Sequence, residues 1–336
     1  MRIGLDAMGG DYAPREVVRG VADVLKAMNG HELVLVGDEP VVRYELERLG
    51  LSPGAVRIVH ASQTIGMNES PVEAVRTKRD SSMVRMASMA SDGELDAVIS
   101  AGNTGAFAAA CQLKMKLLPG VSRAGIAVVL PSFTGPIILC DAGSNITPKP
   151  HHLFEYAVTA NAYARYVLRI DRPRVALLSV GEEDAKGTTL VKQAHELLRD
   201  IRNVNFVGNV EGRDLFRGGC DVVICDGFVG NIALKLIEGL AEGLFKTIAK
   251  EIALASPELA RSFDPVVKRV WANHDYAEYG GAPLLGVDGA CIICHGSSNH
   301  VAIRNAVRVA LDYLTNDLNS IIAAELGKEP APAPAQ

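Results

Sequence analysis

The residues of this sequence that could do chemistry are gathered in short glycine-rich turns, each placed after an apolar run. Backbone N–H groups in such turns, and in the helix starts that follow them, bind anions, and a lysine nearby adds a positive charge. Lys186, between Gly181 and Gly187, is the lysine in such a turn, although most loop lysines are simply solvated. The pattern predicts a site for an anionic ligand. Its candidate residues are Gly9, Gly10, Asp11, Gly102, Asn103, Thr104, Gly105, Asp141, Asn145, Lys186, Asp226, Gly227, Gly230, Asn231 and His295.

The stretch from Cys220 to Ala233 is the most complete of these units. Residues 222–225 are apolar enough for a strand buried on both faces, and Gly227 and Gly230 bracket a tight turn that ends in Asn231. Apolar residues then recur every four positions, at Ile232, Leu236, Leu240, Leu244 and Ile248. That spacing predicts an amphipathic helix. An ordinary strand-to-helix connection has the same pattern, so it is the recurrence of the unit along the chain that favours a binding site.

Several common catalytic motifs are absent from the sequence. It contains no G-x-G-x-x-G, no G-x-x-x-x-G-K-[ST], no H-E-x-x-H and no G-x-S-x-G. These absences weaken the dinucleotide-binding, P-loop, zinc-protease and serine-hydrolase interpretations without excluding any of them.

Cys291, Cys294, His295 and His300 have a spacing that raises the possibility of a zinc site. The alternative is a buried strand with small apolar cysteines, because residues 289–294 are apolar and the chain has no second cysteine pair. We favour the alternative and expect neither a metal nor a cofactor. His295, which precedes Gly296, is the better candidate for a binding residue.

Composition is that of an ordinary globular enzyme. The 336 residues are 48% hydrophobic and 22% charged, and a net charge of -5 argues against a nucleic-acid partner. Six irregularly spaced cysteines and an N-terminus without an apolar leader favour a reduced, cytoplasmic setting. The longest uncharged run, Ala124 to Cys140, contains two prolines and predicts two strands and a turn instead of a membrane span.

Apolar runs alternate with helical patterns along most of the chain, which predicts a three-layer α/β/α fold with a mainly parallel or mixed sheet. In such sheets ligands bind beyond the carboxyl ends of the strands, where the polar turns fall. We expect one catalytic unit over residues 1–326 and a disordered Pro/Ala tail over 327–336. The predicted strands are 2–6, 33–37, 56–60, 95–99, 126–130, 137–140, 175–180 and 222–225, with a further strand around Cys291.

Residues 254–285 are the predicted protruding tip. Pro257 and Pro265 are expected to break it into two short helices. Its apolar face has basic residues beside it, which suits an anionic membrane surface, but packing against the core or a dimer partner has the same pattern. The residues proposed for membrane contact are Leu254, Leu259, Phe263, Val267 and Trp271.

The ordered set of turns resembles the PlsX family of bacterial phosphate acyltransferases. The resemblance rests on motifs distributed over residues 1–325: residues 6–11 with Pro14, and residues 100–105, 181–187, 226–231, 286–289 and 295–296. It implies a fold similar to phosphotransacetylases and isocitrate/isopropylmalate dehydrogenases, and no cofactor. It also implies a reaction in which inorganic phosphate attacks the thioester of a fatty acyl carrier protein directly, giving acyl phosphate for glycerophospholipid synthesis.

The resemblance further implies roles for particular residues and partners. Lys186 and Asn231 match the lysine and asparagine associated with catalysis in the family. Arg76, Lys78 and Arg79 become candidates for docking the acidic carrier protein, with a solvated helix face as the alternative. A homodimer, peripheral membrane contact and a downstream glycerol-3-phosphate acyltransferase are expected. The alternatives are an acetyl- or butyryltransferase that uses acyl-CoA, an NAD-dependent dehydrogenase, and a non-catalytic phosphate- or lipid-binding module.

Overall fold

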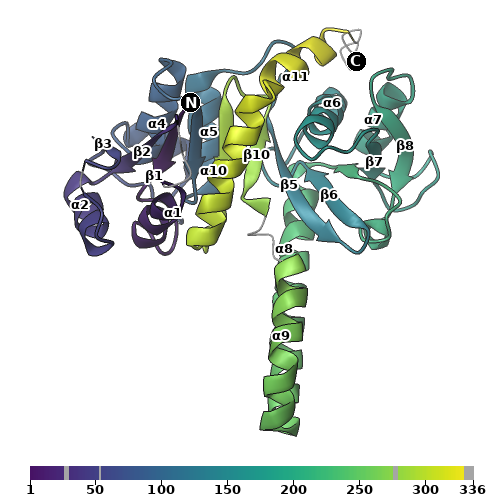
Figure 1. Cartoon of the computed structure of the whole chain (residues 1–336). Helices are drawn as coiled ribbons and strands as arrows, with labels where there is room; N and C mark the ends of the chain where they lie inside the picture. Colours follow the sequence, from purple (N-terminus) through teal and green to yellow (C-terminus); the bar gives the residue numbers. More distant parts are fainter. Residues whose placement is uncertain (26–29, 53, 275–278, 329–336) are drawn as a thin grey trace.

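The computed structural model describes residues 1–25, 30–52, 54–274 and 279–328, without the side chains of residues 268 and 271–274. Most of the predicted tail, residues 329–336, therefore lies outside the described part. The described strands form one 11-stranded sheet in the order β3-β2-β1-β4-β11-β10-β5-β6-β9-β7-β8. Helices cover both faces of the sheet (Figure 1). The predicted α/β layering is confirmed.

Two groups of parallel strands make up most of the sheet. One group holds the N-terminal strands and one late strand: β1 (Arg2–Asp6), β2 (Glu32–Gly37), β3 (Arg57–His60), β4 (Ala97–Ser100) and β11 (Ala290–Ile293). The other holds four strands from the middle of the chain: β6 (Gly135–Cys140), β7 (Arg174–Leu178), β8 (Asn205–Val210) and β9 (Val222–Ile224). The branched apolar side chains of the inner strands β1, β4, β11, β6 and β9 are buried on both faces, as parallel strands under helices require, whereas the edge strands β3 and β8 are partly exposed.

Between the two groups, β10 (Ala282–Leu285) and β5 (Gly125–Ser132) reverse the direction of the sheet. The pairs β11–β10, β10–β5 and β5–β6 are all antiparallel, so the two parallel groups run in opposite directions. The sheet is therefore mixed. The reason is local, because β5 and β6 are joined by two residues only, Phe133 and Thr134, and so short a connection forces an antiparallel pair.

The helices form the two outer layers. Helices α1, α2, α6, α7, α10 and α11 contribute to the core on one face, and α3, α4, α5 and the start of α8 to the core on the other. Their bounds are α1 (Arg15–Leu25), α2 (Glu39–Arg48), α3 (Pro71–Thr77), α4 (Ser82–Ser91), α5 (Thr104–Met115), α6 (Pro150–Tyr166), α7 (Thr189–Arg199), α8 (Gly227–Ala255), α9 (Pro257–His274), α10 (His300–Thr315) and α11 (Leu318–Leu326). A short 3-10 helix covers Gly212–Asp214.

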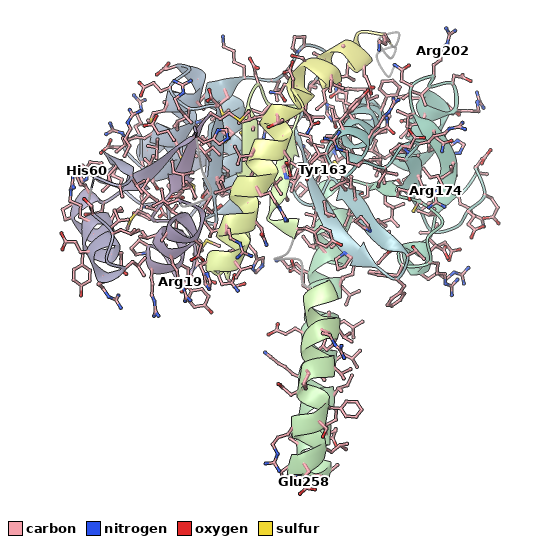
Figure 2. The ribbon with its side chains drawn as sticks, in the orientation of Figure 1. Arg19, His60, Tyr163, Arg174, Arg202 and Glu258 are labelled. Carbon is pink, nitrogen blue, oxygen red and sulfur yellow. The ribbon has the colours of Figure 1, made fainter. Side chains whose placement is uncertain are left out.

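Helices α8 and α9 form a hairpin that projects away from the body (Figure 1). Glu258 lies at its far end (Figure 2). The projection includes much of α8, so it begins earlier in the chain than residue 254. The predicted break at Pro265 is wrong, since α9 runs continuously through it. Pro265 removes one helical hydrogen bond, but it is exposed, so water can satisfy the carbonyl left without a donor.

Candidate functional site

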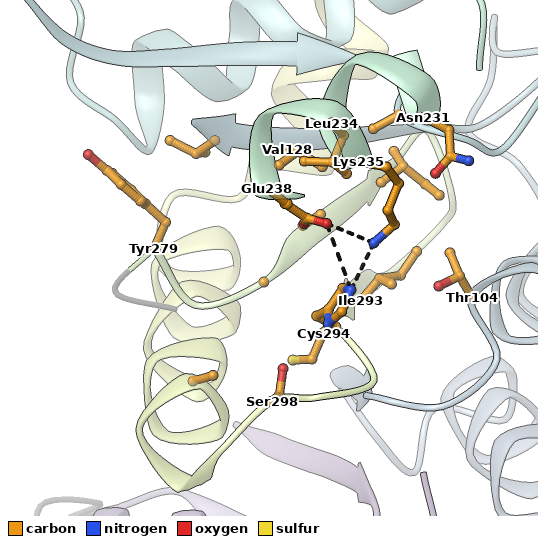
Figure 3. Close-up of a pocket in the computed structure, with 17 residues that line it drawn as sticks. Thr104, Val128, Asn231, Leu234, Lys235, Glu238, Tyr279, Ile293, Cys294 and Ser298 are labelled. Atoms are coloured by element: carbon orange, nitrogen blue, oxygen red, sulfur yellow. Dashed lines mark hydrogen bonds and ion pairs between the residues drawn. The ribbon is translucent and has the colours of Figure 1, made fainter. Parts of the chain in front are cut away.

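A cavity of about 120 Å³ lies between the first turns of α8 and the turn that follows β11. One wall is apolar and comes from β5, β10 and β11. The other carries polar side chains from Thr104, Asn231, Lys235, Glu238, His295 and Ser298 (Figure 3). The remaining lining residues are Ile126, Val128, Val129, Ala142, Leu234, Tyr279, Gly281, Ala282, Ile293, Cys294 and Ala302. The cavity therefore lies over the strands at which the sheet reverses.

Lys235, Glu238 and His295 form a hydrogen-bonded cluster in this cavity. Lys235 Nζ lies 2.8 Å from both Glu238 Oε2 and His295 Nε2. His295 Nδ1 lies 2.8 Å from Ser297 Oγ. Because an ammonium group can only donate, His295 Nε2 accepts from Lys235. The Ser297 N–H donates to His295 Nδ1 at 3.3 Å.

The pKa of His295 is lowered, first because its ring is partly removed from water and second because Lys235 is positively charged. The cluster therefore presents a neutral imidazole beside an ammonium group. An ammonium group binds a phosphate oxygen as a point charge, and a neutral imidazole can move a proton. Lys235 and Glu238 were not predicted from the sequence. The only signal was a lysine within the first turns of a helix that begins at a candidate site.

Asn231 is brought into the same cavity, where its side chain is exposed. It lies against the turn after β6: a Cβ added to Gly143 would fall 3.5 Å from Asn231 Cβ. Gly143 has a φ of 134°, a conformation that only glycine adopts without strain. The small residue thus leaves room for the asparagine at the cavity edge.

Asp141 and Asn145, predicted as binding residues, hold this turn together. The buried Asp141 carboxylate accepts hydrogen bonds from four backbone N–H groups, those of Ile126, Gly143, Ser144 and Asn145. Burial raises its pKa, while the four donors act in the opposite direction. Asn145 donates to the Ala124 carbonyl and to the Tyr156 hydroxyl. Both side chains are engaged in shaping the turn.

Asp226, Gly227 and Gly230 fix the start of α8 onto that turn. The helix begins at Gly227, so the predicted loop through Asn231 is in fact helical. Asp226 Oδ1 accepts from the Val229 N–H at 2.9 Å, and the Gly227 N–H donates to the Asn145 carbonyl at 2.8 Å. Two of the N–H groups expected to face an anion are therefore hydrogen-bonded within the protein.

The predicted N-terminal turns interlock at the ends of β1, β4 and β11. The Asp11 N–H donates to the Gly296 carbonyl at 2.8 Å. A Cβ on Gly9 would lie 2.8 Å from the Gly102 nitrogen, so the two turns pack backbone to backbone. Gly10, with a φ of 106°, is in the left-handed region. These contacts fix the position of the turn that carries His295.

The turn after β4 is also built into the framework. Asn103 caps α5 by accepting from the Ala106 N–H at 3.0 Å, and its amide donates to three carbonyls in residues 66–69. A Cβ on Gly105 would lie 2.8 Å from Pro71 Cγ. Of this turn, Thr104 is the residue that lines the cavity.

Lys186 is exposed, in the loop between β7 and α7, and lines neither this cavity nor a second one along α8. The loop is held at its base, where Asn209 Nδ2 donates to the Glu183 carbonyl at 3.0 Å. Asp184 Oδ1 lies 3.3 Å from His195 Nε2. Because β7 and β9 are neighbours in the sheet, Lys186 and Asn231 follow adjacent strands. The structure does not bring the two side chains into contact.

The zinc interpretation does not fit the geometry. Cys291 belongs to the core on one face of the sheet and Cys294 to the core on the other, as expected for residues three apart in a strand. Cys291 Sγ lies 3.5 Å from Met115 Sδ. Among the described residues, no group of three or more His, Cys, Asp or Glu side chains could hold a metal ion.

Residues 1–321 match the family described as "Fatty acid synthesis protein". The chain belongs to this family. Relatives from three organisms are each named "Phosphate acyltransferase", and the resemblance to that family is confirmed. The protein of Pelotomaculum thermopropionicum is 48% identical over 323 residues, 95% of this chain and 93% of its own. That of Nitratidesulfovibrio vulgaris is 46% identical over 322 residues (94% and 92%), and that of Halothermothrix orenii 45% over 334 residues (98% and 99%).

Solved structures resemble this member of the phosphate acyltransferase family in fold. A phosphotransacetylase from Streptococcus pyogenes has a TM-score of 0.66 at 18% identity and covers 94% of each chain. A branched-chain phosphotransacylase from Enterococcus faecalis V583 has a TM-score of 0.56 at 16% identity and covers 93% of this chain and 98% of its own. The expected similarity to the phosphotransacetylase fold is confirmed.

Proposed function

We propose that this chain transfers a fatty acyl group from the thioester of acyl carrier protein to inorganic phosphate, producing acyl phosphate and the free carrier thiol. The observation that carries the proposal is the cavity in which Asn231, Lys235 and His295 face an apolar wall. Membership of the phosphate acyltransferase family supports the reaction type. A polar rim suits phosphate and a thioester carbonyl, and an apolar wall suits the acyl group.

The reaction needs no covalent enzyme intermediate. A phosphate oxygen attacks the thioester carbonyl carbon, the C–O bond forms, and the tetrahedral oxyanion collapses with cleavage of the C–S bond. The departing thiolate takes the proton that the phosphate gives up. All six cysteines are buried, and burial raises the pKa of Cys294, at the cavity wall, to about 12. A thiol that stays protonated is a poor nucleophile, which supports direct attack by phosphate.

Positioning and charge stabilisation are then the contributions of the protein. In this proposal the Lys235 ammonium binds phosphate, and the Asn231 amide donates to the developing oxyanion. Lys186, on the loop after the neighbouring strand β7, adds a second positive charge when the donor is bound. His295, whose pKa is lowered first by burial and then by Lys235, relays the proton between phosphate and the leaving thiolate.

The test is the loss of thioester from palmitoyl carrier protein and from palmitoyl-CoA, each with and without phosphate. The proposal expects phosphate-dependent loss, an acyl phosphate trapped by hydroxylamine, and a preference for the carrier protein. Preference for a short acyl-CoA would favour the acetyl- or butyryltransferase alternative. No loss from any thioester in folded protein would contradict the proposal.

Carrier-protein docking is proposed for Arg76, in the last turn of α3, and Arg79, in the turn between α3 and α4, which are both exposed. Lys78 is less available, because its Nζ donates to Glu69 Oε1 at 2.6 Å and to the Thr64 carbonyl at 2.8 Å. Positive side chains suit an acidic carrier. Reversing both arginines to glutamate is expected to raise the KM for the carrier with little change in kcat, and an unchanged KM would contradict docking here.

A second copy of the chain is proposed to cover the exposed apolar stripe of α8. Leu236, Leu240 and Leu244 are each more than half exposed, and Ile232 and Ile248 extend the row at both ends. A row of this length is a typical helix–helix interface. Light scattering is expected to give a dimer for the parent and a monomer for Leu240→Glu; a monomeric parent would contradict dimerisation.

Peripheral membrane contact is proposed for the end of the hairpin. Leu254, Leu259 and Phe263 are exposed there, and Arg261 provides a positive charge beside them. Val267 is half-buried while its neighbour Val266 is exposed, and the Trp271 side chain lies outside the described part. Within the described residues, no helix has the length and apolar character needed to cross a bilayer. We further propose that the protein acts in the cytoplasm at the membrane surface, where a glycerol-3-phosphate acyltransferase would consume the acyl phosphate.

A further inference from the structure

A second cavity, of about 680 Å³, runs along α8 beside the first. The two cavities share Lys235, Glu238 and His295, so the cluster stands where they meet. The other residues that line the second cavity are Leu130, Pro131, Ile237, Gly239, Ala241, Glu242, Phe245, Lys246, Ala249 and Ser297. We call this space the α8 groove.

The α8 groove is open to solvent and has an apolar side formed by α8. Ile237, Ala241, Phe245 and Ala249 recur every four residues and so follow one side of the helix. Leu130 and Pro131 of β5 form the facing wall near the cluster. From Lys235 to Ala249 the helix rises by about 21 Å, at ~1.5 Å per residue. That length is comparable to an extended long-chain fatty acyl group.

The charged residues of the groove stand at its edge. Lys246 and Glu242 form an ion pair one helical turn apart, and their side chains are 75% and 57% exposed. Such residues keep their charged ends in water while their methylene stems cover apolar surface. The groove is thus open to water along one edge and charged at the end that adjoins the reaction site.

We propose that the α8 groove binds the acyl chain of the donor thioester, with the reacting carbonyl at Lys235 and His295. The inference rests on the proposed function and deepens it, because it assigns the chain of the fatty acyl donor to a particular part of the molecule. Continuity with the polar cavity is what selects this occupant: a chain in the groove has one end at the cluster, where phosphate would attack. An acetyl group would leave nearly the whole groove empty.

Bulky side chains placed at two distances from Lys235 test this assignment, because each should limit the length of acyl chain that the groove accepts. Ala241 lies about 9 Å along the helix from Lys235, and Ala249 about 21 Å, at ~1.5 Å per residue. Ala241→Phe is expected to lower kcat/KM for a sixteen-carbon donor about tenfold or more relative to a four-carbon donor, because each buried methylene contributes about fourfold to binding. Ala249→Phe is expected to affect only the longest chains. Ala253→Phe, exposed on α8 beyond the groove, is the control and should leave the chain-length profile unchanged.

A second matched pair covers the case in which Ala241→Phe lowers the thermal midpoint. Gly239 lines the groove and Gly243, one turn on, does not; a Cβ at either position meets no atom within 4 Å. Gly239→Leu should shorten the preferred chain and Gly243→Leu should not. Equal loss of activity on all chain lengths, or no change in the groove variants, would overturn the inference while the parent remains an acyltransferase. A parent inactive on every donor would instead overturn the proposed function and, with it, the inference.

Discussion

Lys235 and His295 are 60 residues apart in the chain, yet their side-chain nitrogens meet at 2.8 Å. Lys235 belongs to the helix that follows β9, in one parallel group of strands, and His295 follows β11, in the other. The contact therefore joins the two halves of the sheet at the point where its direction reverses. It also places a cation and a neutral base between the small polar cavity and the α8 groove.

Removing the Lys235 charge is the most informative single substitution. Lys235→Met keeps the length of the side chain and is expected to lower kcat/KM by about 10²–10³, the usual effect of losing one preorganised donor to a developing charge. Lys250→Met, on the exposed distal part of α8, is the matched control. Phosphate-dependent steady-state kinetics measure the effect, and activity equal to the parent would remove Lys235 from the mechanism.

Lys186 is predicted to act on turnover and not on folding. It is exposed on the loop after β7, so Lys186→Ala should leave the thermal midpoint unchanged while kcat falls by about 10²–10³. Lys192→Ala, exposed on the following helix, should change neither quantity. If Lys186→Ala turns over at the parental rate, the loop has no catalytic role.

Two glycines of α8 should respond in opposite ways to the same substitution. A Cβ on Gly230 would overlap the Asp141 carbonyl oxygen, so Gly230→Ala is expected to destabilise the protein by about 1–3 kcal/mol or more. A Cβ on Gly239 meets no atom within 4 Å, so Gly239→Ala should stabilise by about 0.5–1 kcal/mol through helix propensity. Urea unfolding at a common m-value compares them. Similar effects at both positions would contradict the close contact between α8 and the turn after β6.

The lowered pKa of His152 predicts how the free energy of unfolding depends on pH. Burial, followed by the nearby positive charges, lowers its pKa from 6.5 to about 4, and its Nδ1 accepts the Lys149 N–H. The unfolded chain therefore binds a proton at higher pH than the folded protein, and stability is lost as the pH falls from 6.5 towards 4. The contribution is up to about 3 kcal/mol, at ~1.4 kcal/mol per pKa unit. Urea unfolding of the parent and His152→Gln from pH 7 to 4 measures it, and parallel profiles would show that His152 does not titrate in this way.

The exposed hairpin end predicts a membrane phenotype separate from catalysis. Phe263→Glu replaces an exposed aromatic residue with a negative charge and should abolish flotation with anionic liposomes, while activity on a soluble donor is retained. Val207→Glu, at an exposed apolar residue of β8, is the control for added charge. Equal flotation of the Phe263 variant and the parent would rule out contact through this face.

Much of the fold could be predicted, because buried parallel strands and amphipathic helices each have a characteristic spacing of apolar residues. β1, β2, β6 and β9 are nearly continuous apolar runs, and each was located within a residue or two. β8 was missed, since it is an edge strand in which Gly208 and Asn209 interrupt the apolar pattern. The reversal at β5 and β10 depends on pairings between residues far apart, which local periodicity does not encode.

The sequence could not distinguish candidate ligand-binding residues from residues that shape the framework. Asn231, Thr104 and His295 line one cavity, whereas Asp141, Asn145 and Asn103 are hydrogen-bonded within the framework. A polar residue that shapes its own turn and one that faces a ligand have the same sequence context. Lys235 and Glu238 resemble a solvated ion pair on a helix until His295, from another strand, is seen against them.

In the proposed reaction, phosphate attacks the thioester directly. The measurement that tests it most directly is carrier-thiol release when stoichiometric enzyme is mixed with palmitoyl carrier protein, first without phosphate and then with it. Direct attack predicts no thiol release until phosphate is added, followed by release in step with acyl phosphate. Release of one thiol per enzyme before phosphate is added, with the acyl group retained on the protein, would contradict the mechanism.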